Sequence, residues 1–153
     1  MYEYFNGLVI REGKNNLPTE KIKKLYHSVG WSSNNLPSWQ EEKYQLFFEN
    51  STWAYTVWDK DEIVAMVRVI SDKIALADLT DLIVIPEYQK KGIGKKLVQL
   101  CVQKLPHGNW FVHTTSNNYD FYRKCGFSVP DKTLPQGTCT YLGFMIARVE
   151  GHR

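Results

Sequence analysis

Residues 82–97 constrain the fold of this chain more than any other stretch of its sequence. The apolar run Leu82–Ile85 predicts a strand, Pro86 opens a short polar turn, and Gly92 and Gly94 introduce a run with helical spacing. Glycine lets backbone N–H groups approach a ligand closely because it has no Cβ atom. The unpaired N–H groups and the dipole at the start of a helix favour an anion. This strand, turn and helix therefore predict a site for a phosphate or pyrophosphate.

Three phosphate-binding motifs compete for this segment. A Walker A loop requires Gly at position 89 and Ser or Thr after its lysine, but the chain has Gln89 and, after Lys95, Lys96. A dinucleotide fingerprint requires Gly or Ala where the chain has Leu97. The third pattern, Gln/Arg-x-x-Gly-x-Gly/Ala after a strand, is matched at every specified position from Gln89 to Gly94. The alternative is a glycine-rich turn that only begins an ordinary helix.

The third pattern resembles the acetyl-coenzyme A signature of the GNAT N-acetyltransferase superfamily. A second segment supports the same resemblance, because Asp120–Phe127 is similar to the Phe-Tyr-x-Lys-x-Gly-Phe sequence at the end of many GNAT domains. A short helix there would end at Gly126, which suits a left-handed cap. We expect Phe121 and Phe127 to anchor the core and Tyr122 to point elsewhere.

Hydrophobic periodicity and turn residues divide the chain into strands and helices. The expected strands are 2–11, 52–58, 63–70, 75–85, 109–115 and 138–149, with a further one near 127–129. The expected helices run from Pro18 to Gly30, from Ser38 to about Phe48, over 93–104 and over 117–125. Short turns within 52–85 imply an antiparallel meander, and the later strand-helix-strand unit implies parallel pairing.

This order of elements predicts an α/β (α+β) protein with a mixed central sheet and helices on both faces. It resembles the GNAT acyl-CoA N-acyltransferase fold over nearly the whole chain. The expectation is therefore a single N-acetyltransferase domain over residues 1–153.

The resemblance implies a set of contacts with acetyl-CoA as cosubstrate. The backbone of Leu82, Ile83 and Val84 would pair with the pantetheine arm as an added strand does. Backbone N–H groups would hold the pyrophosphate, from Lys90, Lys91, Gly92, Ile93, Gly94 and Lys95. Gln89 would support this loop, and Asn118, with Asn117 as an alternative, would hydrogen-bond the coenzyme.

Acyl transfer expels a thiolate that needs a proton or a strong hydrogen bond, and in the family the tyrosine at the position of Tyr122 often supplies it. The alternative is a packed core tyrosine whose hydroxyl finds a partner. Candidate bases for the amine are Asp78, Asp81 and His113. Asp78 falls where some histone-type members carry a catalytic Glu, and Asp81 matches an acidic position of bacterial and plant members. Many GNAT enzymes use water chains instead, so all three could be bystanders.

The segment between the first two expected helices usually shapes the acceptor pocket in this family. Its Leu25-Tyr26-x-x-Val29-Gly30-Trp31 pattern resembles a bacterial branch similar to plant serotonin N-acetyltransferase-like proteins. The resemblance implies a small-molecule primary amine, an arylalkylamine or polyamine, which Trp31 and Asp81 would contact. Trp39 could line the same pocket or seal two helices together. The alternatives are a protein or peptide N-acetyltransferase and a non-catalytic acetyl-CoA-binding sensor.

Composition narrows the remaining classes of function. The net charge of +3, from 19 Lys and Arg against 16 Asp and Glu, does not favour a nucleic-acid partner. The three cysteines lack metal-ligand spacing, so no metal is expected. No secretory leader opens the chain and no apolar run approaches the roughly 18 residues of a membrane span, so we expect a cytoplasmic protein without a membrane partner. Family members often dimerise through the end that holds Pro130–Gly143, which makes a homodimer a hypothesis.

Overall fold

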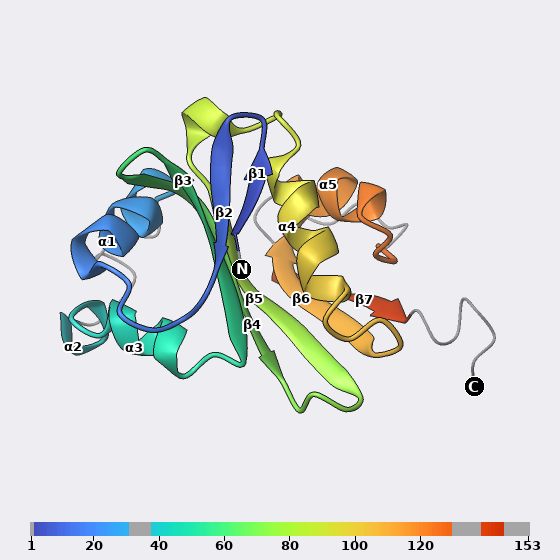
Figure 1. Cartoon of the computed structure of the whole chain (residues 1–153). Coiled ribbons are helices and arrows are strands. Elements are labelled where there is room, and N and C mark those ends of the chain that lie inside the picture. Colours follow the sequence, from blue (N-terminus) through green and yellow to red (C-terminus); the bar gives the residue numbers. More distant parts are fainter. Residues whose placement is uncertain (1, 31–37, 130–138, 146–153) are drawn as a thin grey trace. The chain divides into compact units, whose positions relative to one another are not determined.

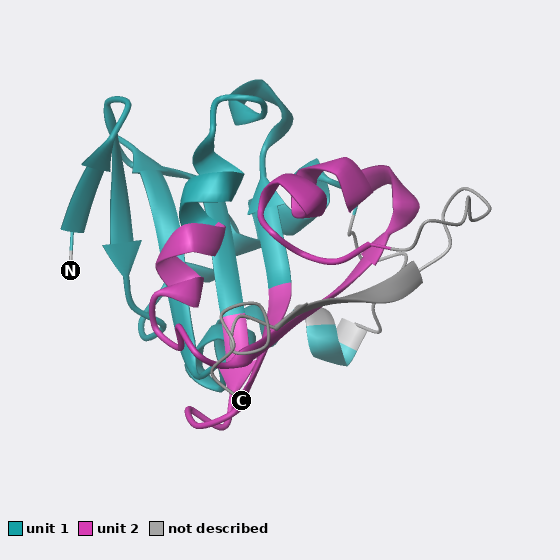
Figure 2. Ribbon diagram, turned by 90° about the vertical axis from the view of Figure 1, so that its right-hand side faces the viewer, with its two compact units in different colours: residues 1–68, 81–97 teal, residues 69–80, 98–153 magenta. Residues whose placement is uncertain are grey.

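The computed structural model describes residues 2–30, 38–129 and 139–145 (Figure 1). The chain divides into two compact units, coloured separately in Figure 2. Unit 1 comprises Met1–Arg68 and Asp81–Leu97, and unit 2 comprises Val69–Thr80 and Val98–Arg153. The single domain over 1–153 stays a prediction.

The described strands form one seven-stranded sheet in the order β1-β2-β3-β4-β5-β6-β7. Their bounds are β1 Tyr2–Phe5, β2 Leu8–Glu12, β3 Trp53–Asp59, β4 Glu62–Ser71, β5 Leu76–Val84, β6 Asn109–Thr115 and β7 Cys139–Met145. The β1–β2, β2–β3 and β6–β7 pairs are antiparallel, and the β5–β6 pair is parallel. The mixed sheet is therefore confirmed, and so is the parallel strand-helix-strand unit.

Helices connect these strands at the places that the sequence predicted, with shorter bounds. They are α1 Thr19–Ser28, α2 Ser38–Glu41, α3 Tyr44–Glu49, α4 Ile93–Val102 and α5 Tyr119–Lys124, with the 3₁₀ turns η1 Pro86–Tyr88 and η2 Ser116–Asn118. Gly30, just beyond α1, has φ +80° and ends the helix as predicted.

The first expected strand is in fact a hairpin. Asn6 (φ +50°) and Gly7 (φ +80°) form a tight turn, and Phe5 pairs with Leu8 across it. Both turn residues lie in the left-handed region, as a type I′ turn requires, and Asn-Gly is the sequence that favours this turn most strongly. The single strand predicted over 2–11 was wrong because the apolar residues on both sides masked this signal.

The second expected helix is broken into α2 and α3. Lys43 (φ −113°, ψ 22°) leaves the helical region between them. The break lets Tyr44 and Phe48, one turn apart on α3, both be completely buried. Near 127–129 the structure has an isolated bridge at Ser128 rather than a strand. In both places, tertiary packing overrode a local helix or strand preference.

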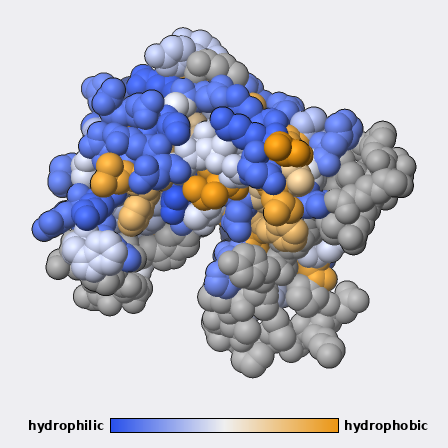
Figure 3. All heavy atoms as spheres, turned by 90° about the horizontal axis from the view of Figure 1, so that it is seen from below, coloured by the Kyte–Doolittle hydropathy of each residue, from blue (hydrophilic) through white to orange (hydrophobic). Residues whose placement is uncertain are grey.

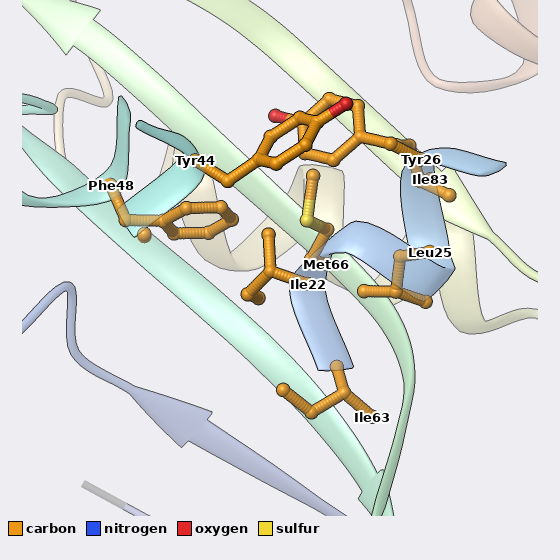
Figure 4. Close-up of a cluster of buried hydrophobic side chains, with 9 residues drawn as sticks. Ile22, Leu25, Tyr26, Tyr44, Phe48, Ile63, Met66 and Ile83 are labelled. Atoms are coloured by element: carbon orange, nitrogen blue, oxygen red, sulfur yellow. The ribbon is translucent and has the colours of Figure 1, made fainter. Parts of the chain in front are cut away.

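The core of unit 1 lies between α1, α3 and one face of the sheet (Figure 4). Its buried members are Ile22, Leu25, Tyr26, Tyr44, Phe48, Ala54, Ile63, Met66 and Ile83. Tyr26 and Tyr44 stack with ring centroids 4.6 Å apart. This aromatic pair fixes α1 against α3.

The start of α4 lies against the opposite face of the unit 1 sheet. Along β3, Ala54 belongs to the core under α1 and α3, so Val57 points to the other face. Val57 pairs in register with Ile10, and both are completely buried. On the strand beside them, Glu3 forms an ion pair with Lys96 of α4. Within unit 1, helices therefore cover both faces of the sheet, as predicted (Figure 1).

The face drawn in Figure 3 is mainly hydrophilic, and its hydrophobic residues form small separate patches. Such scattered apolar surface is ordinary for a folded domain. Among the described residues, no helix is both long enough and apolar enough to span a membrane.

Candidate functional site

The loop between β5 and α4 has the backbone conformation of an anion-binding nest. Lys90 (φ +61°) and Gly92 (φ +83°) both lie in the left-handed region, on either side of Lys91. Alternation of handedness over successive residues directs neighbouring N–H groups into one concavity. The α4 ladder begins where the Lys96 N–H donates to the Gly92 carbonyl at 3.0 Å. The N–H groups of residues 93–95 precede that bond and face the same loop end.

Side chains around the loop hold it in this shape. The Gln89 carboxamide donates to the Val84 carbonyl at 2.9 Å, which ties the loop back to the end of β5. The Ile93 side chain is almost completely buried and anchors the first turn of α4. The predicted loop residues are contiguous, and Gln89–Gly92 and Lys95 are exposed.

The β1–β2 hairpin braces the same loop, a contact that the sequence analysis missed. Asn6 Nδ2 lies 3.5 Å from the Lys91 carbonyl, at the limit of a hydrogen bond. A Cβ atom at Gly92 would lie 3.6 Å from Cζ of Phe5. The Asn-Gly turn was the available signal for the hairpin, but nothing in the sequence indicated that it would lie against residues more than 80 positions away.

A cavity of about 740 Å³ borders the outer side of the loop. Its lining residues are Asn6, Gly7, Leu8, Asp59, Glu87, Tyr88, Lys91 and Ile93. The Tyr88 hydroxyl donates to the Asp59 carboxylate, and this hydrogen bond raises the pKa of Tyr88. Two carboxylates among the lining residues, Asp59 and Glu87, make this cavity a less suitable phosphate site than the nest.

The predicted pantetheine strand lies in the second half of β5. The parallel register of β5 with β6 covers Leu76–Leu79 opposite Asn109–Val112 and ends there. β5 itself continues to Val84, so residues 80–84 lie beyond this register. The backbone positions of Leu82, Ile83 and Val84 fall in that continuation.

Asp81 lies in a buried network that the sequence analysis did not foresee. Its Oδ2 atom accepts a hydrogen bond from the Tyr26 hydroxyl of α1 at 2.6 Å and from Nε of Arg68 of β4 at 2.6 Å. The Asp81 and Arg68 side chains are each 15% exposed. Arg68 Nη1 also lies 3.4 Å from the Phe47 carbonyl and from Ser51 Oγ. This network joins α1, α3, β4 and β5 through one carboxylate.

The network raises the pKa values of Tyr26 and Arg68. Burial raises the pKa of Tyr26, and the Asp81 carboxylate raises it further, so Tyr26 remains the hydrogen-bond donor. Burial alone would lower the pKa of Arg68, but the charge of Asp81 acts together with Tyr26 and the hydrogen bonds to both, and the pKa is raised. Both described bonds to Asp81 use Oδ2, and no described residue donates to Oδ1. Asp81 therefore retains one oxygen that can accept from a ligand.

Arg68 was detectable in the sequence as a single cation within the apolar run Ile63–Ile70. A buried charge requires a partner, which should have prompted a search for a carboxylate on a neighbouring strand. Asp81 and Ile83 both contact the α1 side of the sheet, so Leu82 between them points to the other face.

In unit 2, Tyr122 lies in a tight aromatic group at the end of the chain's last described helix. The ring centroid of Tyr122 is 5.0 Å from that of Phe121 and 5.5 Å from that of Phe127, both with edge contacts. Tyr122 and Phe127 are buried, whereas Phe121 is only half-buried. Phe127 anchors the core as expected, but the expectation that Phe121 does so while Tyr122 points elsewhere was wrong, because Tyr122 is buried and Phe121 is not.

The end of α5 confirms the predicted left-handed cap. Gly126 has φ +96°, its N–H donates to the Arg123 carbonyl, and the Phe127 N–H donates to the Tyr122 carbonyl. These two bonds form a Schellman motif. This cap directs Phe127 into the core. Gly126 therefore also fixes the conformation of the backbone beside Tyr122.

The remaining predicted residues of unit 2 lie on β5, β6 and η2. Asp78 is half-buried opposite Phe111, and His113 is exposed on β6. Asn118 is exposed, and its amide donates to Thr114 Oγ1 at 2.9 Å. This hydrogen bond links η2 to β6. The side-chain carbonyl oxygen of Asn118 can still accept a hydrogen bond from a ligand.

Two tryptophans were proposed to shape the acceptor pocket. Trp31 lies outside the described residues, as does the segment 130–138. Trp39 is 58% exposed, with the Lys43 ammonium 5.5 Å from its ring centroid. Trp39 therefore does not seal two helices together.

The structure thus gathers the predicted residues into two groups. Unit 1 holds Asp81, the β5 positions 82–84 and the loop 89–95, and unit 2 holds Asp78, His113, Asn118 and Tyr122. The first group combines an anion nest with a half-satisfied carboxylate, and the second combines a buried phenol with polar strand and turn residues.

The family described as "Acetyltransferase (GNAT) family" matches residues 21–127 of the chain. The chain is 38% identical over 69 residues to "GCN5-related N-acetyltransferase 2, chloroplastic" from Arabidopsis thaliana. This match covers 43% of the chain and 27% of the relative, so the chain spans about a quarter of the length of that plant protein.

Solved acetyltransferase structures share the fold. A GNAT family acetyltransferase from Streptococcus pneumoniae TIGR4 superposes with a TM-score of 0.67 at 26% identity, over 86% of this chain and 97% of that one. An aminoglycoside 6'-N-acetyltransferase complexed with coenzyme A superposes with a TM-score of 0.72 at 18% identity, over 90% of this chain and 96% of that one. These similarities confirm the predicted fold class.

Proposed function

The chain belongs to the GNAT acetyltransferase family, which uses acetyl-CoA as cosubstrate, and we propose that it transfers the acetyl group directly to a primary amine of a small molecule in the cytosol. The observation that carries the proposal is the nest at Lys90–Gly92, placed at the start of α4 in the loop that follows β5 and η1. A pyrophosphate needs several converging N–H donors, and this loop supplies them without a side chain in the way.

The coenzyme's contacts follow from this nest. The backbone N–H groups of residues 90–95 would bind the pyrophosphate, with Gln89 holding the loop to the Val84 carbonyl. The pantetheine arm would extend along Leu82–Val84, which lie beyond the register that β5 shares with β6. An extended amide chain added there forms main-chain hydrogen bonds like a further strand.

Asp81 is the proposed contact for the acceptor amine. Its Oδ2 atom is occupied by Tyr26 and Arg68, whereas Oδ1 receives no hydrogen bond from a described residue. Because Arg68 already balances its charge, Asp81 is better suited to orienting an amine N–H than to removing its proton. Trp31 is the proposed aromatic neighbour of the same amine.

The reaction needs one nucleophile, one acid and one proton acceptor. The amine lone pair attacks the thioester carbonyl carbon, the C–N bond forms and the C–S bond breaks. Tyr122 donates a proton or a hydrogen bond to the departing thiolate, and the proton lost by the amine passes to Asp78, His113 or water. Asn118 would hydrogen-bond the coenzyme near Tyr122.

Coenzyme binding is tested with two glycine variants of matched backbone geometry. Gly92 (φ +83°) and Gly30 (φ +80°) would each strain an alanine similarly, and among the described residues neither has a neighbour closer than 3.6 Å to the added Cβ. We expect acetyl-CoA at about 100 times its Kd to stabilise the wild type by about 2.7 kcal/mol. Gly92→Ala should weaken coenzyme binding about tenfold or more, and Gly30→Ala should leave it unchanged. Equal coenzyme affinity in both variants would mean that Gly92 has only a structural role in its turn.

Turnover is tested with Tyr122→Phe and a panel of acceptors. The variant keeps the ring contacts with Phe121 and Phe127, so it should fold and bind acetyl-CoA normally. We expect kcat to fall about 10²- to 10⁴-fold, the range for loss of a general acid. Thiol release with arylalkylamines and polyamines, but not with lysine peptides, supports the small-amine acceptor. Release only with peptides favours a protein acetyltransferase, and coenzyme binding without any release favours a sensor.

A further inference from the structure

A second cavity in unit 1 surrounds an arginine that has no counter-ion among the described residues. The cavity, of about 300 Å³, lies between the loop that precedes α1 and the β2–β3 pair. It shares no residue with the cavity beside the coenzyme loop. Its lining residues are Tyr2, Arg11, Glu12, Gly13, Asn15, Asn16, Leu17, Pro18, Thr56 and Trp58. Its volume is at the lower end of the range for small-molecule sites.

Arg11 is held in this cavity by aromatic rings and not by acceptors. Its guanidinium carbon lies 4.3 Å from the Trp58 ring centroid and 5.7 Å from that of Tyr2. No described residue accepts a hydrogen bond from Arg11 or forms an ion pair with it, and its Nε atom is buried without a partner. A half-buried guanidinium without an acceptor is unfavourable, and an anion in the cavity would relieve this cost.

The surrounding groups orient the Arg11 guanidinium so that it can bind a planar anion. The Trp58 indole N–H donates to Thr56 Oγ1 at 2.8 Å, so the indole ring is fixed in place. Trp58 also packs against the core of unit 1, which makes it a rigid platform for Arg11. A stacked guanidinium presents its N–H groups edge-on, in the fork that binds a carboxylate.

The other lining residues restrict the polarity and the charge of the rest of the ligand. Leu17, Pro18 and the aromatic rings offer apolar contact, and the Asn15 and Asn16 side chains add neutral polar groups. Glu12 lines the same cavity and opposes a second negative charge. We propose that this cavity binds a small monoanionic aryl carboxylate, with the carboxylate on Arg11 and the ring against the apolar wall.

The experiment compares two probes that differ in charge. The ¹⁵N-labelled full chain is titrated with indole-3-acetate and with its uncharged amide, indole-3-acetamide, and the Trp58 indole N–H and the Asn15 and Asn16 signals are followed. We expect saturable shifts of these signals with the acid and at least about tenfold weaker binding of the amide, the loss expected for a charged hydrogen-bonded pair. Equal binding of both probes, or no saturation well above millimolar concentration, overturns the proposal.

Two substitutions test whether Arg11 contributes to the binding of indole-3-acetate. Arg11→Gln should weaken indole-3-acetate binding about tenfold or more. The matched control, Arg123→Gln, removes an exposed arginine paired with Asp120 and should leave binding unchanged. Equal effects of the two substitutions contradict a role for Arg11. If Arg11→Gln does not fold, the acid and amide comparison on the wild type still decides the proposal.

Discussion

The Arg68–Asp81 pair should behave as a buried ion pair, and Arg68→Met tests this directly. The substitution keeps much of the apolar stem, but it leaves Asp81 with only the Tyr26 hydroxyl as a described donor. Breaking a fully buried pair costs about 3–5 kcal/mol, whereas an exposed pair contributes about 0–1 kcal/mol. Because both side chains are 15% exposed, we expect the free energy of unfolding to fall by about 2–4 kcal/mol.

Urea unfolding followed by circular dichroism measures this change, with the midpoint and the slope m fitted together. The control is Arg123→Met, whose pair with Asp120 has side chains 55% and 86% exposed and should change stability by less than about 0.5 kcal/mol. The double variant Arg68→Met with Asp81→Asn should lose less than the sum of the single losses, by at least about 1 kcal/mol. A loss below about 1 kcal/mol in Arg68→Met, or simple additivity, would refute the reasoning that Arg68 holds Asp81.

Further predictions concern parts of the molecule away from Asp81. Three backbone N–H groups that donate to the Asp72 carboxylate lower its pKa. The stability that it contributes is therefore present above its ordinary pKa of about 3.9 and is lost as the pH falls through the lower folded value, and an ordinary pKa in an NMR titration would contradict this. Lys14→Met should destabilise the protein by about 1–3 kcal/mol in urea unfolding, because the Lys14 ammonium donates to two backbone carbonyls at the end of α3. The exposed Lys24 supplies the control, since Lys24→Met should have little effect. If the segment Pro130–Gly143 forms a homodimer interface, light scattering should give twice the mass of one chain, and the mass of a single chain would remove that hypothesis.

Several parts of the fold could be predicted because their causes are local. The strand bounds 109–115 match β6 because Gly108 and the polar turn at 116–118 enclose a run rich in aromatic and β-branched residues. The Gln89–Gly94 motif identified the loop because Gly92, one of its specified residues, has a positive φ, which glycine adopts at little cost. The same reasoning placed Gly126 at the end of α5, where only a residue without a Cβ atom is left-handed at low cost.

Other expectations failed where distant residues decide the outcome. The helix expected from Ser38 breaks before Tyr44 because Tyr44 must reach the Tyr26 ring on α1. Tyr122 is packed between its neighbours because the core of unit 2 needs its ring as well as that of Phe127. Neither requirement leaves a periodic signal in the surrounding residues.

The sequence alone determined the class of fold, the position of the anion-binding loop and the residues available for chemistry. These depend on backbone conformations and on apolar spacing, which adjacent residues control. Only the tertiary structure decided what each side chain meets: Arg68 and Tyr26 on one oxygen of Asp81, and Arg11 between two aromatic rings. Those contacts join residues up to 55 positions apart in the chain, so they exist only once burial has brought the strands and helices together.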